Sequence, residues 1–298
     1  MLNIIGNKNT FFTFSGIVIT ASIGAMVLFG FKQSVEFTGG TLWQFRIPTE
    51  SATVSDIETV FKTKLEVGEP KVSVDAITKT FLVKLPVVTE NDHQQLLQAL
   101  SMPYPSFTEL DFQSIGPSVG AELKTKAMTS ILLVLVGISV YIAFAFRKIT
   151  RPISSWKYGW VTLFTLFHDI VIPAGLLAAL GAYAHVEIDS NFVVALLVVA
   201  GFSVHDTIVV FDRIRENLFL DREKTDFAKV INQSVNQTLG RSINTSFTLI
   251  LVLIALYLTG PAQLRYFNLT LLVGVITGIY SSIFIASPIL LLTSRKKR

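Results

Sequence analysis

The chain has 298 residues, of which 51% are hydrophobic and only 15% are charged, against about 25% charged in a typical soluble protein. The hydrophobic residues are bunched into long uninterrupted runs and the mean hydropathy is +0.56, which excludes a soluble protein. There is no cysteine, which excludes disulfides, thiol catalysis and iron–sulfur clusters, and the net charge of +4 comes from basic residues that flank the apolar runs, so we expect no nucleic-acid binding.

Six segments are long and apolar enough to cross a membrane, since a spanning helix needs about 20 mostly apolar residues. They are residues 11–31, 126–146, 158–179, 191–211, 243–259 and 266–292. The first could be taken for a cleavable signal peptide. Its apolar stretch is long, however, and no small-x-small cleavage site follows it, so we interpret it as an uncleaved first span.

Lysine and arginine predict the orientation of these spans, because short cytoplasmic loops are enriched in both. Basic residues gather in the loops 147–157 and 212–242 and in the tail 293–298, whereas the opposite short loops contribute only Arg265. Both termini, residues 1–10 included, are therefore predicted to be cytoplasmic, with residues 32–125 outside. We expect the basic tail to contact anionic lipid; contact with a ribosome or a partner is the alternative.

Residues 32–125 have the pattern of a small α+β domain. Strands are predicted over 35–47, 71–76, 80–86 and 106–113, and helices from Ser51 or Ser55 to Leu65 and from Thr89 or Asn91 to Leu100, with a turn at Thr78–Lys79. The order β-α-β-β-α-β is that of ferredoxin-like domains. His93 is expected to be solvated on a polar helix face. Without a visible catalytic set, this extracytoplasmic domain is predicted to contact other proteins or to move.

Ionisable residues inside the spans are the first functional candidates, because inserting each one costs roughly 2.5–3.5 kcal/mol. Asp169 follows His168 midway along the third span, and Asp206 follows His205 in the fourth. Arg241, where the fifth span begins, is expected to face Asp206. Protonation of such a paired acid would break the pair and let the two helices repack, which makes a proton switch.

Other interpretations of these residues stand beside the proton switch. The pair could be a static buried ion pair, or Arg241 could extend to the lipid headgroups, and Asp169 could be held by serine or threonine as a structural group. The His–Asp pairs suggest a metal site, but consecutive helical side chains point about 100° apart, so each pair offers one inward ligand. We predict no metal. Gly274 and Gly278 are expected to let the sixth span approach a neighbour closely.

Four segments resemble motifs of the SecD/SecF family of protein-export membrane proteins. They are Val35–Gly40, Gly116–Leu123, Gly201–Asn217 and Asn232–Ser246. His168 and Asp169 also fit the third span of SecF, and the single small external domain is similar to that of SecF rather than the larger SecD. One position departs from the family pattern, since His205 stands where asparagine is expected before the acid.

The resemblance implies one half of a twelve-span unit of the RND transporter superfamily, an α-helical protein of the bacterial cytoplasmic membrane that works beside SecD. It also implies association with the SecY-E-G channel and use of the proton-motive force to draw preproteins outward late in translocation, with no covalent catalysis and no organic cofactor. On this resemblance Asp206 is the essential acid of the fourth span and Arg241 its basic partner. His205 and Asp169 are further proton-coupling candidates.

The resemblance also marks the two ends of the external domain. Glu36, Gly39 and Gly40 belong to the first motif, and Gly116 and Pro117 begin the second. Glycine lets a backbone turn sharply, so these positions are expected to act as a hinge; an ordinary turn at a domain boundary is the alternative. Two other functions are alternatives: a proton-coupled exporter of small hydrophobic molecules, which six spans could form only with a second subunit, and a static scaffold.

Overall fold

In the computed structural model the chain forms two compact units, Gln33–Ala127 and the combination of Met1–Lys32 with Met128–Arg298. The structure describes residues 2–48, 52–64, 70–75, 80–147, 153–220 and 226–294. Outside these residues lie Ser51, Leu65, the predicted turn at Thr78–Lys79 and part of the basic loops and tail (Lys148, Arg151, Arg222, Lys224 and Arg295–Arg298).

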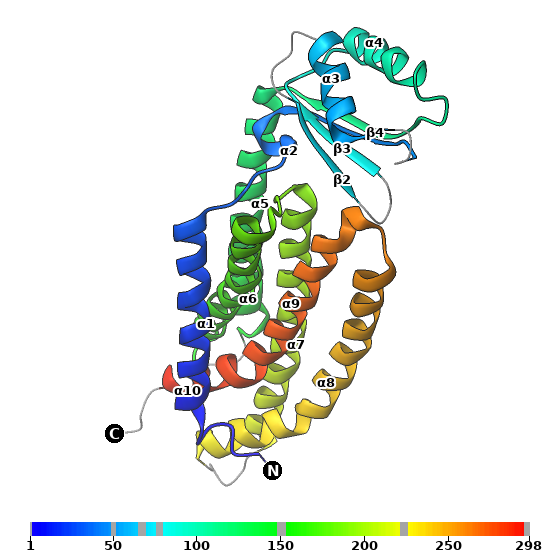
Figure 1. Ribbon diagram of the computed structural model, residues 1–298. Helices are drawn as coiled ribbons and strands as arrows, with labels where there is room; N and C mark the ends of the chain where they lie inside the picture. Colours follow the sequence, from blue (N-terminus) through cyan, green and yellow to red (C-terminus); the bar gives the residue numbers. More distant parts are fainter. Residues whose placement is uncertain are drawn as a thin grey trace. The chain divides into compact units, whose positions relative to one another are not determined.

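The helical unit is built from long apolar helices, and within the described ranges six helical segments are able to cross a membrane, as predicted. They are α1 (Lys8–Phe29), α5 (Pro117–Ala145), α6 (Ser155–Ala184), α7 (Ser190–Leu220), α8 (Phe227–Thr259) and Arg265–Leu292 (Figure 1). The last segment is made of α9 (Arg265–Ser281), the π-helical η2 (Ser282–Ala286) and α10 (Ser287–Leu292), and the short η1 (Ala262–Leu264) precedes it. α5 begins in the other unit.

The connection between the fourth and fifth spans differs from the prediction of a loop over 212–242. α7 continues to Leu220 and α8 already begins at Phe227. The reason is amphipathic packing beyond the membrane-crossing parts: Ile214 of α7 and Ile231 and Val235 of α8 are buried in one apolar cluster. A hydropathy window finds only the apolar part of such a helix, so its polar extension was interpreted as loop.

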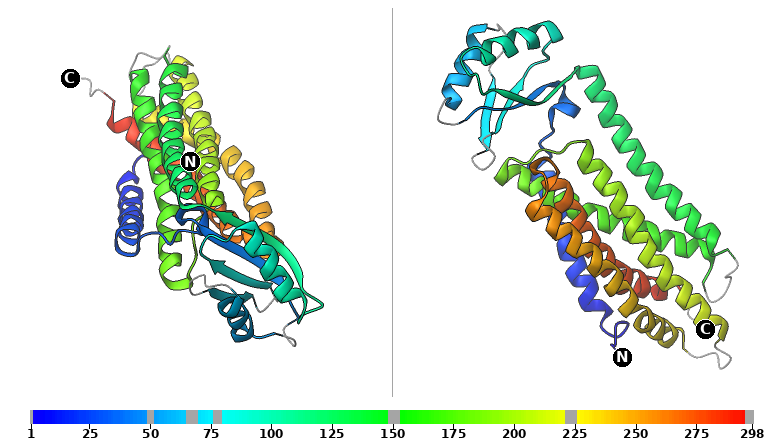
Figure 2. Two further views of the ribbon diagram at one scale, coloured as in Figure 1. Left: turned by 90° about the horizontal axis from the view of Figure 1, so that it is seen from above. Right: turned by 90° about the vertical axis from the view of Figure 1, so that its right-hand side faces the viewer.

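α6 is the most buried of the spans, and it packs against α1, α7 and α9 (Figure 2). α9 packs in turn against α7 and α8. The predicted close approach of the sixth span is confirmed: a Cβ atom on Gly274 would overlap the side chain of Val199, and one on Gly278 would lie 3.1 Å from the Cβ of Ser203. Small residues thus bring the α9 backbone directly against α7.

The other unit has the predicted ferredoxin-like order. Its antiparallel sheet has the strand order β2-β3-β1-β4, with β1 (Gly40–Arg46), β2 (Lys71–Asp75), β3 (Thr80–Leu85) and β4 (Thr108–Ile115). The helices α3 (Val54–Lys64) and α4 (Glu90–Ser101) supply the rest of its core. Alternate side chains of β1 face these helices, so Trp43 and Phe45 are fully buried with Ile57 and Leu96.

The first strand begins later than predicted. Residues Val35–Thr38 form a helical turn, α2, because the Ser34 hydroxyl accepts a hydrogen bond from the Glu36 amide and caps it. Gly39, with φ 78° and ψ 158°, then ends the turn in a backbone conformation essentially restricted to glycine. Gly40 (φ 129°) starts β1.

The prediction that His93 is solvated is wrong. Its ring is stacked on Phe112 with 3.6 Å between the ring centroids, and only 6% of the residue is exposed. Its Nε2 lies 2.8 Å from Oε1 of Glu109, the same oxygen that accepts a hydrogen bond from Trp43 Nε1. His93 shares a helix face with Leu96, three residues on, and this spacing could have revealed its burial.

Candidate proton-coupling site

Asp206 is a buried acid on α7, with only 2% of the residue exposed. Ser246 of α8 donates a hydrogen bond to its Oδ2 at 3.3 Å, which is long for a hydroxyl donor. The neighbouring His205 has a side chain that is 60% exposed, and its Nδ1 lies 3.9 Å from Oδ1 of Asp206. Asp206 therefore combines burial inside a span with a long hydrogen bond, which makes it the leading candidate for a functional acid in this unit.

Arg241 does not form the predicted ion pair with Asp206. It is exposed, and within the described part of the chain it makes no ion pair within 4.0 Å. The reason is helical geometry: α8 buries Ser242 and Ser246, four residues apart, on the side that faces α7. Arg241 precedes Ser242 by one residue and so lies about 100° around the helix. Small hydroxyls rather than a guanidinium face the acid.

Asp169 is fully buried on α6 and is held by three side chains. Its Oδ2 accepts hydrogen bonds from Ser203 of α7 and from Ser281 of α9, the latter at 2.7 Å. Its Oδ1 lies 2.8 Å from Nδ1 of His168. One carboxyl group thus joins three helices at the centre of the unit.

Ser282 of η2 links two residues of α7, one beside each acid. Thr207, next to Asp206, shares a hydrogen bond of 2.8 Å with Ser282. The Ser282 hydroxyl also approaches the carbonyl oxygen of Ser203 at 3.4 Å, and Ser203 donates to Asp169. Ser282 is the first residue of the π-helix, a local irregularity found frequently at functional sites.

These hydroxyl residues were missed by the sequence analysis, although a signal for them existed. Ser203 and Ser246 belong to the two motifs that surround Asp206 and Arg241, and Ser281–Ser282 is a polar pair inside an apolar span. Hydroxyls within a membrane span that lie at helix–helix contacts generally hydrogen-bond across them. Only the packing of α6, α7, α8 and α9 reveals which acid each hydroxyl contacts.

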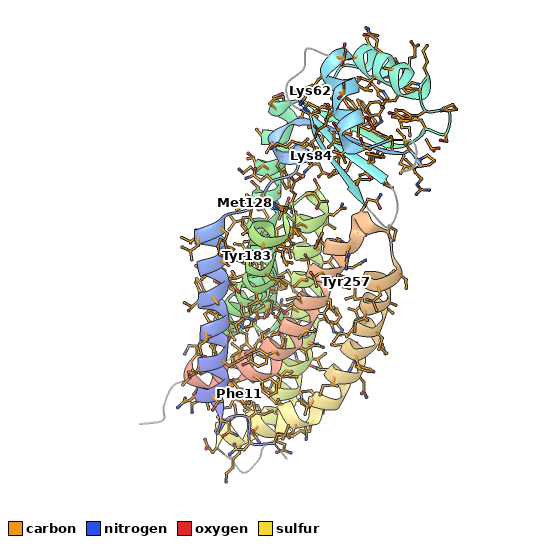
Figure 3. All side chains as sticks on the ribbon, viewed as in Figure 1. Phe11, Lys62, Lys84, Met128, Tyr183 and Tyr257 are labelled. Carbon is orange, nitrogen blue, oxygen red and sulfur yellow. The ribbon has the colours of Figure 1, made fainter. Side chains whose placement is uncertain are left out.

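His168 also connects the site to α1. Its ring stacks on Tyr280 of α9 with 6.2 Å between centroids. The Tyr280 hydroxyl donates a hydrogen bond of 2.9 Å to the carbonyl oxygen of Phe11, which is labelled near the start of α1 in Figure 3. In the ranges that the structure describes, no three histidine or acidic side chains are grouped as a metal ion would require.

The two external motifs, which carry the residues expected to act as a hinge, lie against one another within the Gln33–Ala127 unit. A Cβ atom on Gly39 would lie 2.7 Å from Cα of Pro117, and one on Gly120 would lie 3.0 Å from the carbonyl oxygen of Phe37. Gly116, in contrast, has open space around its Cα. Glu36 lies within α2. The two motifs therefore form one tight backbone crossing, and glycine is required at Gly39 for both its dihedral angles and its lack of a side chain.

Comparison with known proteins places this arrangement in a family. Residues 95–296 match the family model described as "Protein export membrane protein SecD/SecF, C-terminal". The chain is 39% identical to "Protein translocase subunit SecF" of Thermobaculum terrenum over 97% of this chain and 93% of that protein. It is 33% identical to "Protein translocase subunit SecDF" of Thermus thermophilus, over 94% of this chain and 37% of that longer protein.

A solved structure agrees with the sequence relatives. The crystal structure of SecDF from Thermus thermophilus, described as a translocon-associated membrane protein, superposes with a TM-score of 0.81 at 31% identity. The match covers 98% of this chain and 38% of that chain. With the six spans, the ferredoxin-like unit and the acids at the centre of the helices, these matches lead to one conclusion: the chain belongs to the SecD/SecF family of protein-export membrane proteins, in its SecF branch.

Proposed function

We propose that this chain is an accessory subunit of the Sec protein translocase that works with SecD and uses the proton-motive force to promote late preprotein translocation. Its similarity to translocase subunits named SecF supports the translocase role. The relative named SecDF, of which this chain corresponds to 37%, supports a functional partnership with SecD. The SecY-E-G channel and the emerging preprotein are the other proposed partners, in the bacterial cytoplasmic membrane with both termini on the cytoplasmic side.

The observation that carries proton coupling is the setting of Asp206. Asp206 is buried and its hydrogen bond to Ser246 is long, so its charged form lacks the strong contacts that would hold it ionised, and a proton can bind there without breaking a strong interaction. A change of that charge alters the hydrogen bond to Ser246 and hence the contact between α7 and α8. The proposed cycle needs no covalent step, no metal and no organic cofactor.

Asp169 has a different proposed role. Its hydrogen bonds to Ser203 and Ser281, with the short contact to His168, already satisfy both carboxyl oxygens. Such an acid favours one fixed state, and we assign it the positioning of α7 against α6 and α9 rather than proton transfer. Arg241 and His205 are both exposed, so their side chains are free to pair with other charged groups during the proposed cycle.

Complementation tests this proposal. Cells depleted of their own SecF receive the wild-type chain or Asp206→Asn, and accumulation of the precursor of a secreted protein is followed. Glu90→Gln provides a matched acid-to-amide control, because Glu90 has a side chain that is 72% exposed on α4. The proposal predicts that precursor accumulates with Asp206→Asn at normal membrane levels but not with Glu90→Gln. Normal export by the Asp206→Asn chain would contradict it.

A further inference from the structure

Two asparagines of α8 bind the chain's own N-terminal segment through its backbone. Asn236 makes a two-point contact with Leu2: its Oδ1 accepts a hydrogen bond from the Leu2 amide at 2.8 Å, and its Nδ2 donates one to the Leu2 carbonyl oxygen at 3.0 Å. A side-chain amide used in this way pairs with a peptide group as a neighbouring strand would. The contact is independent of the Leu2 side chain, which is exposed.

Asn232, one turn earlier on the same helix face, continues this contact. Its Oδ1 accepts hydrogen bonds from the amides of Ile4 (2.9 Å) and Ile5 (3.3 Å), and its Nδ2 donates to the Leu2 carbonyl oxygen at 3.0 Å. Asn236 Nδ2 also donates to the carbonyl oxygen of Asn232 at 2.7 Å, which fixes the orientation of its amide. Five hydrogen bonds thus join residues 2–5 to two side chains.

Burial of the isoleucines strengthens the attachment. Ile4 is 2% exposed and Ile5 is 7% exposed, and both belong to the apolar cluster that includes Ile231 and Val235 of α8 and Leu290 of α10. The start of α1, the first turns of α8 and the end of α10 lie at the same end of the helical unit (Figure 1). Polar contacts to the backbone and apolar contacts of the side chains therefore act on one short segment.

α8 is anchored unevenly along its length. Seven of its eight buried residues fall between Val230 and Ser246, and only Leu253 is buried beyond them. The N-terminal segment is attached to this well-packed part of α8, residues 230–246, which ends at Ser246 beside Asp206. A displacement of α8 would be concentrated beyond Ser246, where fewer residues are buried, because the part before it is tied to the segment that precedes α1.

We propose that Asn232 and Asn236 form a clasp that binds the backbone of residues 2–5 and makes the start of α1 and residues 230–246 of α8 move as one body. Both asparagines belong to the fifth-span motif, and neither contacts Asp206 or Asp169 in the structure. The clasp gives this part of the motif a role separate from the acids.

Hydrogen exchange of the full chain in lipid nanodiscs tests the clasp. Asn232→Leu removes the acceptor for the Ile4 and Ile5 amides, and their exchange is expected to rise by at least about fivefold. Asn232→Asp keeps that acceptor and should largely retain protection of both amides. Gln233→Leu, at the exposed neighbouring position, is the control for general loosening, and the amides of α6, the most buried span, report on the stability of the helical unit.

The outcomes are distinct. Faster exchange of the Ile4 and Ile5 amides in Asn232→Leu alone supports the clasp. Leu2→Ala should leave this exchange unchanged, because the asparagines bind the backbone of the segment and not the Leu2 side chain. Unaltered exchange in Asn232→Leu, or an equal rise in Gln233→Leu, would overturn it. The role of the clasp in export rests on the proposed function, and it predicts at least about fivefold slower export by Asn232→Leu. Normal export despite faster exchange would refute that role. The exchange result itself does not depend on export.

Discussion

Ser203 of α7 donates a hydrogen bond to Asp169 of α6, one helical turn before Asp206. The two buried acids therefore have different positions in one structure: Asp169 holds the turn of α7 that carries Asp206, and Ser281 of α9 donates to the same carboxyl oxygen. Under the proposed function, a change in the charge of Asp206 would act on a helix that Asp169 already holds against α6 and α9. The proposal thus gives Asp169 a positioning role and Asp206 the proton-carrying role.

Replacement of Asp169 should therefore depend on hydrogen-bonding capacity rather than on charge. Asp169→Ala leaves the Ser203 hydroxyl without its acceptor, and a buried unsatisfied group costs about 1–3 kcal/mol. The Ser281 hydroxyl keeps a second acceptor, the carbonyl oxygen of Gly278 at 3.2 Å. Asp169→Asn retains an oxygen acceptor, so its free energy of unfolding should lie within about 1 kcal/mol of the wild-type value. Unfolding in mixed detergent micelles measures both, and an alanine variant as stable as wild type would contradict the assignment.

Replacement of Arg241 should separate function from stability. The side chain is exposed and makes no ion pair with Asp206, so Arg241→Gln should change the free energy of unfolding by less than about 0.5 kcal/mol. Export should fall if the guanidinium is needed during the cycle. A large loss of stability would instead indicate the static ion pair that the sequence left open. The same micelle unfolding, with precursor accumulation beside it, measures both effects.

The contact between α9 and α7 predicts a specific steric effect. A methyl group at position 274 would overlap Val199, so Gly274→Ala should destabilise the chain by about 1–3 kcal/mol. Val199→Ala should partly restore the stability of that variant, because it removes the overlapping atoms. Gly137→Ala is the matched control in another span, since a Cβ there meets no atom within 4 Å. Equal effects at Gly274 and Gly137 would contradict the proposed packing.

The crossing of the two external motifs predicts unequal tolerance at its glycines. Gly39→Ala places a Cβ against the Pro117 backbone and imposes a dihedral strain of about 1–3 kcal/mol, so it should destabilise the Gln33–Ala127 unit strongly. Gly116→Ala meets no neighbouring atom and should be tolerated. Exchange of the β1 amides, compared between the two variants, measures the difference; similar protection in both would speak against the crossing.

The features that follow from a repeating hydrophobic pattern were predictable from the sequence. Apolar runs revealed the six spans, and the alternation of strands and helices revealed the ferredoxin-like order, because both patterns arise from local hydrophobic periodicity. Gly274 and Gly278 were correctly interpreted for a related reason, since small residues spaced four apart mark one helix face.

Features set by the angular position of a side chain on its helix were not predictable. Asp206 and Arg241 lie on adjacent helices, but one residue of offset replaces Arg241 with Ser242 and Ser246 on the face toward α7. The burial of His93 is an exception, because its spacing of three residues from Leu96 already places it on the buried face of α4. The helical turn at Val35–Thr38 was predicted as the start of a strand, because Ser34, the residue that caps it, lies outside the strand-like run.

The most direct test of proton coupling measures translocation with and without a proton gradient. Inverted membrane vesicles containing SecD, SecY-E-G and this chain are supplied with a preprotein, and the rate of its late translocation is compared before and after addition of an uncoupler. With the wild-type chain the gradient should accelerate this step. With Asp206→Asn the rate should equal that of the uncoupled wild type in both conditions. An Asp206→Asn chain that is still accelerated by the gradient would show that the proton acts elsewhere.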